Sequence, residues 1–251
     1  MIFREANRAV LADQVYANVK RALFNFELLP GERFSENQIV ERTGASRTPV
    51  REALTRLARE GFLSVQIRAG WQVNELDFKL FDQLYELRTI LELAAIERLC
   101  RQAEPAGIEA LQAIWQCDES ERPAQGEVVF SLDEAFHGQL VAATGNTELA
   151  HAHTRVIERI RIVRQLDFTH AERIEATYRE HAAILHAIAR HRADEARRLM
   201  QAHIETSRQA VQKISLHRLY EARERARQQA KTSSFEPVTG GLRSTAPVTT
   251  P

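Results

Sequence analysis

An aspartate and a histidine in the middle of the chain have the spacing of a pair of metal ligands. Asp133 and His137 stand four residues apart, so on a helix both side chains project from the same face. Phe130 and Leu140 flank the pair at helical spacing, which predicts that this face is turned inward. A buried carboxylate beside a buried imidazole can supply one oxygen and one nitrogen ligand to a metal ion.

Two further histidines could complete such a site. His181 and His203 each occur on an apolar helix face, about equally far from a turn expected near Arg192. In an antiparallel helix pair they would lie at the same level of the bundle, and with the Asp–His pair would offer three nitrogens and one oxygen. The alternative is that core hydrogen bonds satisfy these histidines. No pattern distinguishes the remaining ones, which are His151, His153, His170, His186, His191 and His217.

A basic segment near the N-terminus has the residue types for contact with a polyanion. Between residues 42 and 59 it opposes several arginines with the single acid Glu52, although the whole chain has 34 basic and 34 acidic residues. Arginine makes bidentate contacts with guanine or phosphate, so the segment suggests a nucleic-acid surface. A solvated helix face is the alternative. The arginines are Arg42, Arg47, Arg51, Arg56 and Arg59.

The elements that would carry these arginines read as a helix-turn-helix. A helix is expected over about residues 9–26, and Ser35 with Gln38 forms a capping box that opens a short helix closed by Gly44. The next helix has Pro49 in its first turn, where proline is tolerated. Its core face would be Val50, Ala53, Leu54, Leu57 and Gly61, with Thr48, Arg51, Glu52, Thr55 and Arg59 pointing away.

A hairpin wing is expected directly after this second helix. Residues 62–65 and 71–73 read as short strands around the basic tip Arg68-Ala69-Gly70. Residues 1–75 thus form a candidate winged helix-turn-helix domain. Residues 76–230 have almost no glycine or proline and show three- and four-residue apolar spacing, which predicts an all-α bundle. Residues 231–251, rich in Thr, Ser, Pro and Gly, are expected to be a disordered tail.

The bulk composition is that of a globular protein, with 44% hydrophobic and 27% charged residues. No apolar run approaches the ~20 residues of a membrane span. The first ten residues include charges where a signal peptide would need an apolar region. We therefore expect a cytoplasmic protein without membrane contact, whose cysteines, Cys100 and Cys117, are reduced.

The N-terminal region resembles the GntR family of bacterial transcription regulators over residues 9–75. The residues that carry the resemblance are the stretches 30–36 (PGERFSE) and 46–54 (SRTPVREAL), then Leu57, Glu60-Gly61 and Gly70. The resemblance implies that Arg47 and Arg51 contact bases and phosphates, that Thr48 adds a contact, and that Arg68 with Gly70 forms the wing. Asn37 is a further candidate for DNA contact. For Arg51, a salt bridge to a neighbouring helix is the alternative.

The region from Asp77 to about residue 215 resembles the FCD ligand-binding domain of the FadR branch of that family. The resemblance rests on Tyr85-Glu86-Leu87-Arg88 with Glu92, Asp133-x-x-Phe136-His137, Asn146, Glu180-His181 with Ile184 and Ala187-Ile188, Ala196 and His203-Ile204. It implies that Asp133, His137, His181 and His203 hold a divalent metal, which we expect to be zinc or nickel. The chain departs from the family at His191-Arg192, where Gly-Asp is usual.

Around an octahedral ion, four protein ligands leave two positions for a small carboxylate effector. A carboxylate also favours a nearby cation, and Arg88 and Arg161 are the candidates. Either could instead pair with an acid on its own helix, Glu92 for Arg88 or Glu158 for Arg161.

Together these features predict a homodimeric, ligand-responsive DNA-binding regulator, mainly α in fold. Paired recognition helices would read a pseudopalindromic operator, and we expect a repressor of a metabolic operon. One alternative is a metalloenzyme, although the sequence offers no obvious general base and an enzyme would not need the winged domain. Another is a constitutive DNA-binding protein with a purely structural metal.

Overall fold

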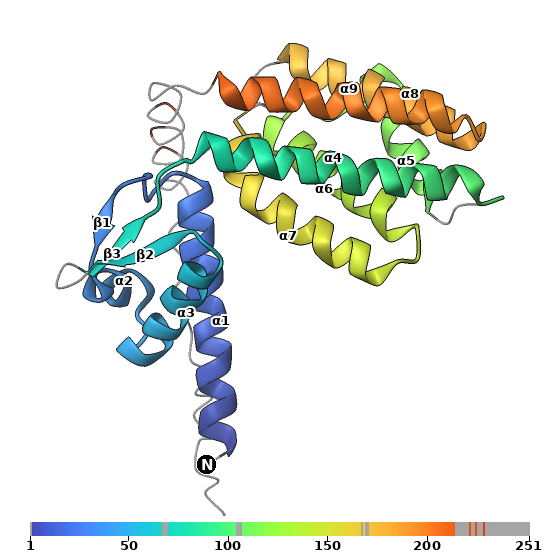
Figure 1. Ribbon diagram of the computed structural model, residues 1–251. Coiled ribbons are helices and arrows are strands. Elements are labelled where there is room, and N and C mark those ends of the chain that lie inside the picture. The colour runs from blue at the N-terminus through green and yellow to red at the C-terminus, as the bar shows by residue number, and fades with distance from the viewer. Residues whose placement is uncertain are drawn as a thin grey trace, which may run out of the picture. The chain divides into compact units, whose positions relative to one another are not determined.

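The chain forms two compact units, which divide between Leu76 and Asp77 (Figure 1). The computed structural model describes residues 2–66, 70–103, 107–166, 168 and 171–213, together with the isolated positions 221, 224 and 228. The tail expected over 231–251 lies outside the described residues. Within the described part of the chain, no helix is both long and apolar enough to cross a membrane.

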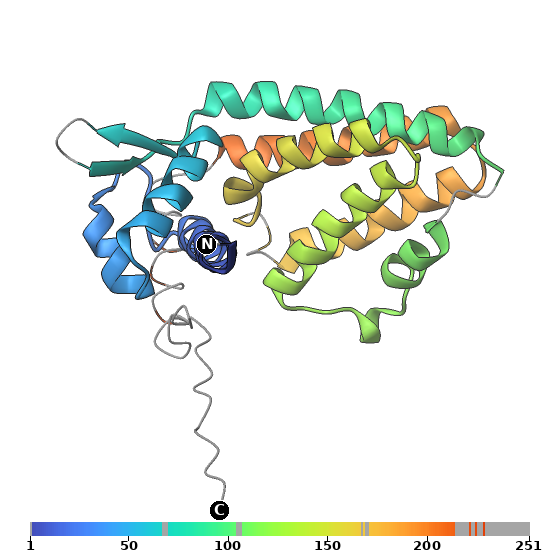
Figure 2. The same ribbon diagram turned by 90° about the horizontal axis from the view of Figure 1, so that it is seen from below.

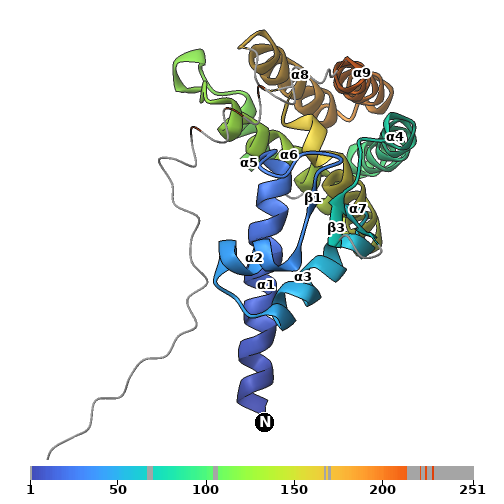
Figure 3. The same ribbon diagram turned by 90° about the vertical axis from the view of Figure 1, so that its left-hand side faces the viewer.

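The N-terminal unit contains three helices and three short strands among its described residues. The helices are α1 (Ile2–Phe24), α2 (Glu36–Thr43) and α3 (Arg47–Arg59), and the strands are β1 (Arg33–Phe34), β2 (Leu63–Gln66) and β3 (Gly70–Val73). Both α2 and α3 pack beside α1 (Figure 3). The antiparallel strands lie in the order β1-β3-β2, and β2 and β3 form the hairpin drawn in cyan in Figure 2.

The residues expected to begin and end the first helix of the helix-turn-helix do so. Ser35 and Gln38 form the full capping box at the start of α2, and Gly44 ends that helix in the left-handed conformation with φ of 70°. In α3 the expected core residues Val50, Ala53, Leu54 and Leu57 are buried, whereas Gly61 lies beyond the end of the helix at Arg59 and is exposed. This buried face packs against α1, so the opposite face of α3 remains available to a partner.

The first helix differs at both ends from the expected range of 9–26. The helix begins at Ile2. It ends at Phe24 because Phe26 adopts a left-handed backbone with φ of 56° and is buried. A bulky residue rarely takes that conformation, so this reversal was not visible in the helical pattern. The chain then turns back and contributes β1, a strand too short to be detected by alternation.

Close approach of β1 to the wing explains the glycine at the start of β3. Gly70 has φ of +86°, and a Cβ atom there would lie 2.6 Å from the backbone oxygen of Phe34. Phe34 pairs with Trp71 across the two strands. The wing residues 67–69, including Arg68, lie outside the described residues.

The C-terminal unit is helical throughout its described residues. Asp77 and Asn146 cap α4 and α7 by accepting from Leu80 N at 3.0 Å and Leu149 N at 3.1 Å. Helix α4 packs against α6, α7 and α9, and α8 packs against α9 and α5 (Figure 1). The expected class, a winged helix-turn-helix followed by an all-α bundle, is confirmed. The elements are α4 (Phe78–Arg101), α5 (Ile108–Trp115), the 3-10 turn η1 (Glu119–Glu121), α6 (Gly126–Ala142), α7 (Thr147–Arg164), α8 (Ala171–Ala189) and α9 (Ala193–Gln212).

Candidate metal centre and nucleic-acid interface

One carboxylate and three imidazoles meet inside the helical unit. Asp133 and His137 come from α6, His181 from α8 and His203 from α9, and none is more than 2% exposed. The Nε2 atom of His203 lies 3.1 Å from that of His137 and 3.4 Å from that of His181. The Oδ1 atom of Asp133 lies 3.4 Å from His181 Nε2 and 3.6 Å from His137 Nε2. Each side chain therefore offers one ligand atom within 4.8 Å of the other three.

This spacing fits a shared metal ion. Two nitrogens bound at about 2.1 Å to one ion lie about 3.0 Å apart at a right angle and about 3.4 Å apart at a tetrahedral angle. The separations of 3.1 and 3.4 Å between the imidazole nitrogens match these values. Asp133 Oδ1 is also buried and has no hydrogen-bond partner among the described residues. Buried polar atoms are ordinarily satisfied, so this oxygen is available to a metal ion. The four donors suit a divalent ion.

Carboxylates outside the quartet hold two of the three rings. Glu92 Oε2 lies 2.6 Å from His137 Nδ1, and Glu180 Oε2 lies 2.6 Å from His203 Nδ1. An acceptor at Nδ1 keeps the proton there and leaves the Nε2 lone pair directed at the centre. The ring of His181 is held by stacking on Phe136, with centroids 3.7 Å apart.

The environment favours the protonation states that bind metals. Burial is the main reason that the pKa values of His181 and His203 lie well below the usual range. Burial alone would raise the pKa of Asp133, but the adjacent Arg164 guanidinium, together with the histidines beside it, outweighs burial and holds this pKa well below its usual range. Neutral imidazole and ionised carboxylate are the forms that coordinate a metal.

Two buried arginines border the quartet. Arg88 on α4 donates from Nε to Glu92 Oε1 at 2.7 Å, while both of its terminal nitrogens have no hydrogen-bond partner. Arg164 on α7 pairs with Asp133 Oδ2, and its Nε and Nη1 atoms also have no partner. Arg161, the other candidate from the sequence, is 41% exposed in its side chain and pairs with Glu134 at 3.1 Å. The structure therefore buries Arg164, rather than Arg161, beside the site.

Three members of this buried cluster were not assigned to the site from the sequence. They are Arg164, Glu92 and His153, whose Nε2 lies 3.0 Å from Glu92 Oε1. From the sequence, Glu92 entered only as a residue of the FCD resemblance and as a possible pairing partner of Arg88. A usable signal was present for α7, because residues 153, 156, 160 and 164 recur at helical spacing on one face. All four are buried.

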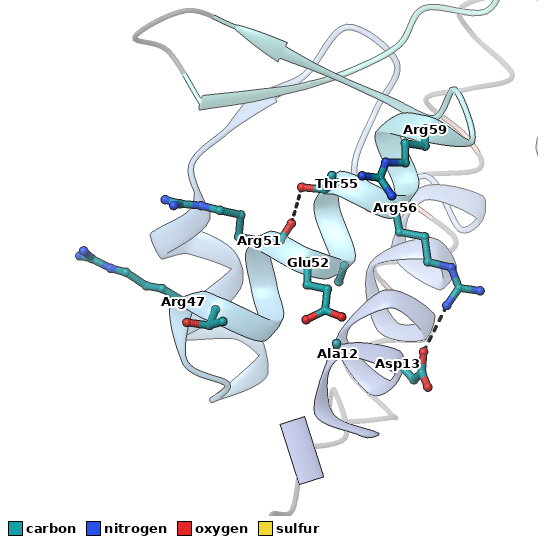
Figure 4. A pocket seen from close by; sticks show the side chains of 10 residues that line it. Ala12, Asp13, Arg47, Arg51, Glu52, Thr55, Arg56 and Arg59 are labelled. Carbon is teal, nitrogen blue, oxygen red and sulfur yellow. Dashed lines mark hydrogen bonds and ion pairs between the residues drawn. The ribbon is translucent and has the colours of Figure 1, made fainter. Parts of the chain in front are cut away.

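In the N-terminal unit, α3 presents arginines on its exposed face. A groove of about 720 Å³ runs along it and is bordered by Asp13 of α1. Figure 4 shows Arg47 and Arg51 projecting from α3 away from α1, while Arg56 reaches Asp13 in an ion pair of 3.1 Å. The groove is lined by Ala12, Asp13, Arg47, Thr48, Arg51, Glu52, Ala53, Thr55, Arg56 and Arg59.

A neighbouring hollow brings together candidates that are distant in sequence. Asn37 of α2, Arg47 of α3 and Gly70 of β3 all line this space of about 380 Å³. Asn37, Arg47 and Thr48 are exposed, as a DNA-contacting residue must be. The sequence candidates other than Arg68 therefore lie on or beside two adjoining hollows of the winged unit.

Arg51 also forms the inter-helix salt bridge that the sequence left open. Its Nε and Nη2 atoms donate to the two carboxylate oxygens of Glu36, each at 2.9 Å. The hydrogen bond from Arg51 is the main reason that the pKa of Glu36 is lowered. The Arg51 side chain is nevertheless 69% exposed, and exposed ion pairs contribute little to stability. The pair can therefore be exchanged for a phosphate or base.

Fold and surface together are those of a DNA-binding transcription regulator with a helical C-terminal unit. Residues 11–73 match the bacterial regulatory proteins of the gntR family, and residues 83–206 match the FCD domain. The chain belongs to the GntR family and carries an FCD domain after its winged helix-turn-helix.

Known relatives agree with this assignment. The chain is 35% identical over 182 residues to the "Nta operon transcriptional regulator" of Aminobacter aminovorans, which covers 72% of this chain and 85% of that protein. It is 27% identical over 206 residues to the "HTH-type transcriptional repressor RspR" of Escherichia coli K12, covering 80% and 89%. The solved structure of E. coli McbR/YncC superposes with a TM-score of 0.62 at 19% identity, covering 84% and 97%. The first two relatives are named as transcription regulators, not as enzymes, and the solved structure shows the same fold.

Proposed function

We propose that this chain is a homodimeric transcriptional repressor that releases or binds its operator in response to a small organic acid held at a metal ion. The observation that carries the proposal is the convergence of three Nε2 atoms and Asp133 Oδ1 within 4.8 Å. Buried guanidinium groups with free donors border that convergence. A site that offers both open metal positions and unpaired guanidinium donors suits a carboxylate.

Asp133, His137, His181 and His203 would hold the divalent ion, with zinc or nickel as the expected metals. The bound ion would supply positive charge and open coordination positions for a carboxylate. Glu92 and Glu180 would orient two of the imidazole ligands through their Nδ1 atoms. This arrangement favours a sensing role, since a purely structural metal would have no need of the nearby unpaired arginine donors.

We assign the effector carboxylate to Arg88 and Arg164. Arg88 keeps two terminal nitrogens without a hydrogen-bond partner, and Arg164 keeps Nε and Nη1. Arg161 was the second candidate from the sequence, but its half-exposed side chain and its ion pair with Glu134 make it the weaker choice. Guanidinium–carboxylate contacts are commonly bidentate, which would add geometric selectivity.

On the DNA side, α3 would enter the major groove of the operator. Arg47, Thr48 and Arg51 would contact bases and phosphates there, with Asn37 beside them. The wing, through Arg68 and Gly70, would follow the backbone. A pseudopalindromic operator requires two such units, so we propose a homodimer. The exposed apolar residues Leu87 and Ile90 on α4, 42% and 59% exposed, are candidates for its interface.

Effector binding would shift the population of dimer conformations and thereby change operator affinity. The junction at residues 74–77 is a candidate for transmission because both of its ends are anchored. Asn74 Nδ2 donates to Gly61 O at 2.7 Å in the winged unit, and Asp77 caps α4 in the helical unit. Similarity to a relative named as a repressor supports repression as the direction of control.

A thermal-shift screen of small organic acids would test the sensing function. Metal-loaded protein and chelated protein are screened side by side, because ligand binding raises the apparent stability of the native state. We expect at least one acid to raise the melting temperature of the loaded form only. An acid panel that shifts neither form would count against metal-dependent sensing and leave DNA binding as a separate function.

A further inference from the structure

We infer that the acid sensed by the helical unit is a dianion with two carboxylates, one for the metal and the other for the guanidinium groups of Arg88 and Arg164. The inference rests on the metal site proposed above and narrows its effector class. It follows from the count of buried charges around the quartet and from the hydrogen-bond donors that those charges leave unused.

The permanent charges in the core of the helical unit cancel before a metal is added. Among the described residues, the acidic and basic side chains no more than 2% exposed are Arg88, Glu92, Asp133 and Arg164. Two guanidinium cations thus face two carboxylates, and an imidazole that binds a metal through Nε2 is a neutral ligand, which adds no charge. A divalent ion in the quartet would raise the buried charge to plus two. Uncompensated buried charge is costly, so a ligand that brings two negative charges is favoured.

Charges at the edge of the cluster do not supply this compensation, because they occur in pairs. Arg161 pairs with Glu134 at 3.1 Å, and Arg173 pairs with Glu180 at 2.9 Å. Each pair contributes one cation and one carboxylate. The net charge around the metal is therefore set by the four buried charged residues counted above.

The unused donors show where the second carboxylate would be held. Arg88 donates a hydrogen bond only from Nε, to Glu92, and Arg164 donates only from Nη2, to Asp133. Four guanidinium nitrogens in all, two from each arginine, are buried without a hydrogen-bond partner among the described residues. A carboxylate bound to the metal through one oxygen has one oxygen left free, which accepts two hydrogen bonds at most, whereas a second carboxylate can accept the remaining ones. Buried donors of this kind are ordinarily satisfied in a functional state.

Matched pairs of acids separate this inference from the proposed function. Malonate, succinate and glutarate are each compared with their monoamides, which keep length and shape but lose one charge. Binding to the full-length, zinc-loaded protein is measured by calorimetry and by thermal shift. We expect the dicarboxylate that fits to bind at least about tenfold more tightly than its monoamide, the effect of one charge-assisted hydrogen bond.

Equal affinity for a dicarboxylate and its monoamide would overturn the inference while leaving metal-dependent acid sensing intact. Absence of any zinc-dependent binding across the series would overturn both. Dicarboxylate binding of equal strength in chelated protein would also contradict the inference, because the metal would then hold neither carboxylate.

Variants of α7 test the role of Arg164 directly. In Arg164→Gln we expect the preference for the dicarboxylate over its monoamide to fall to less than about threefold, since one charge-assisted contact is lost. Arg164→Lys keeps the charge and should keep a preference. Arg161→Gln removes a cation one turn away on the exposed side and should leave the preference unchanged. Melting temperatures without ligand show whether each variant folds. If Arg164→Gln folds and still prefers the dicarboxylate over its monoamide as strongly as the wild type does, the assignment of the second carboxylate to Arg164 is refuted.

Discussion

The Nε2 atoms of His137 and His203 face each other across 3.1 Å, while a carboxylate holds the Nδ1 atom of each ring. With both protons drawn to Nδ1, the two facing nitrogens present lone pairs to each other. Two acceptors at that distance repel unless a cation lies between them. The relationship therefore makes the pair a preorganised half of a metal site.

The carboxylate behind His203 gives the first prediction. In Glu180→Gln the anchor at Nδ1 loses its charge, so the imidazole becomes a weaker donor and the metal affinity should fall about tenfold. A competition titration of zinc against a chromophoric chelator measures this affinity. Glu175→Gln on the same helix removes the exposed partner of Arg122 and should leave zinc binding unchanged. Wild-type zinc affinity in Glu180→Gln would show that the carboxylate does not tune the ligand.

A ligand variant gives the second prediction. His181→Gln should lose the rise in melting temperature that zinc gives the wild type, because one of four ligands is removed from a buried site. At a metal concentration of a hundred times Kd that rise corresponds to about 2.7 kcal/mol. His186→Gln, an exposed change one turn further along α8, should respond to zinc and to chelator like the wild type. A normal zinc response in His181→Gln would exclude this histidine as a ligand.

The recognition helix gives the third prediction. Arg51→Ala should weaken binding to an operator selected from random DNA by about 1–3 kcal/mol, with a loss of discrimination if the contact is to a base. A loss that is uniform across sequences, with a salt slope reduced by about one, would identify a phosphate contact instead. Arg101→Ala removes an exposed arginine from the helical unit and should change neither quantity. Unchanged operator binding in Arg51→Ala would contradict the assignment of α3.

The glycine of the wing gives the fourth prediction. Gly70→Ala should destabilise the winged unit by about 1–3 kcal/mol, because φ is +86° and the new Cβ would approach Phe34 O to 2.6 Å. Gly138→Ala in α6 meets no atom within 4 Å and should stabilise by about 0.5–1 kcal/mol, as expected for a helix interior. Chemical denaturation of both variants measures the two changes. We expect the two changes in the free energy of unfolding to have opposite signs. An unchanged free energy of unfolding in Gly70→Ala would show that β1 and β3 can separate at this position.

The exposed apolar residues of α4 give the fifth prediction. The double variant Leu87→Asp with Ile90→Asp should shift the protein from dimer to monomer in sedimentation, because it places charges in the proposed interface. Val128→Asp on α6 alters an equally exposed apolar residue and should leave the dimer intact. Dissociation by Val128→Asp alone would move the interface to α6.

The sequence was most informative where chemistry depends on local spacing. The i, i+4 spacing of Asp133 and His137, and the equal distances of His181 and His203 from the turn, predicted side chains that the structure brings together. The capping box at Ser35 likewise set the start of α2. For the Asp133–His137 pair and the cap at Ser35, a helix period or a cap fixes the geometry without long-range information, whereas the two further histidines also required the expectation of an antiparallel helix pair.

Long-range pairing accounts for what the sequence did not reveal. Arg164 reaches Asp133 from another helix, and Glu92 reaches both His137 and His153, so their roles depend on how α4, α6 and α7 pack. The strand β1 exists only because β3 pairs with it. The sequence pointed to Arg161 and not to Arg164, and only burial on the face of α7 distinguishes the two.

Operator affinity measured with and without metal and acid tests the central claim most directly. Fluorescence anisotropy of a labelled operator is followed in zinc-loaded and chelated protein, each with and without the acid that stabilises the loaded form. The proposal couples acid binding at the metal to operator binding. We therefore expect the acid to change operator affinity about tenfold in the loaded protein and to leave it unchanged in the chelated protein. The same operator affinity under all four conditions would contradict a metal-dependent, acid-responsive regulator.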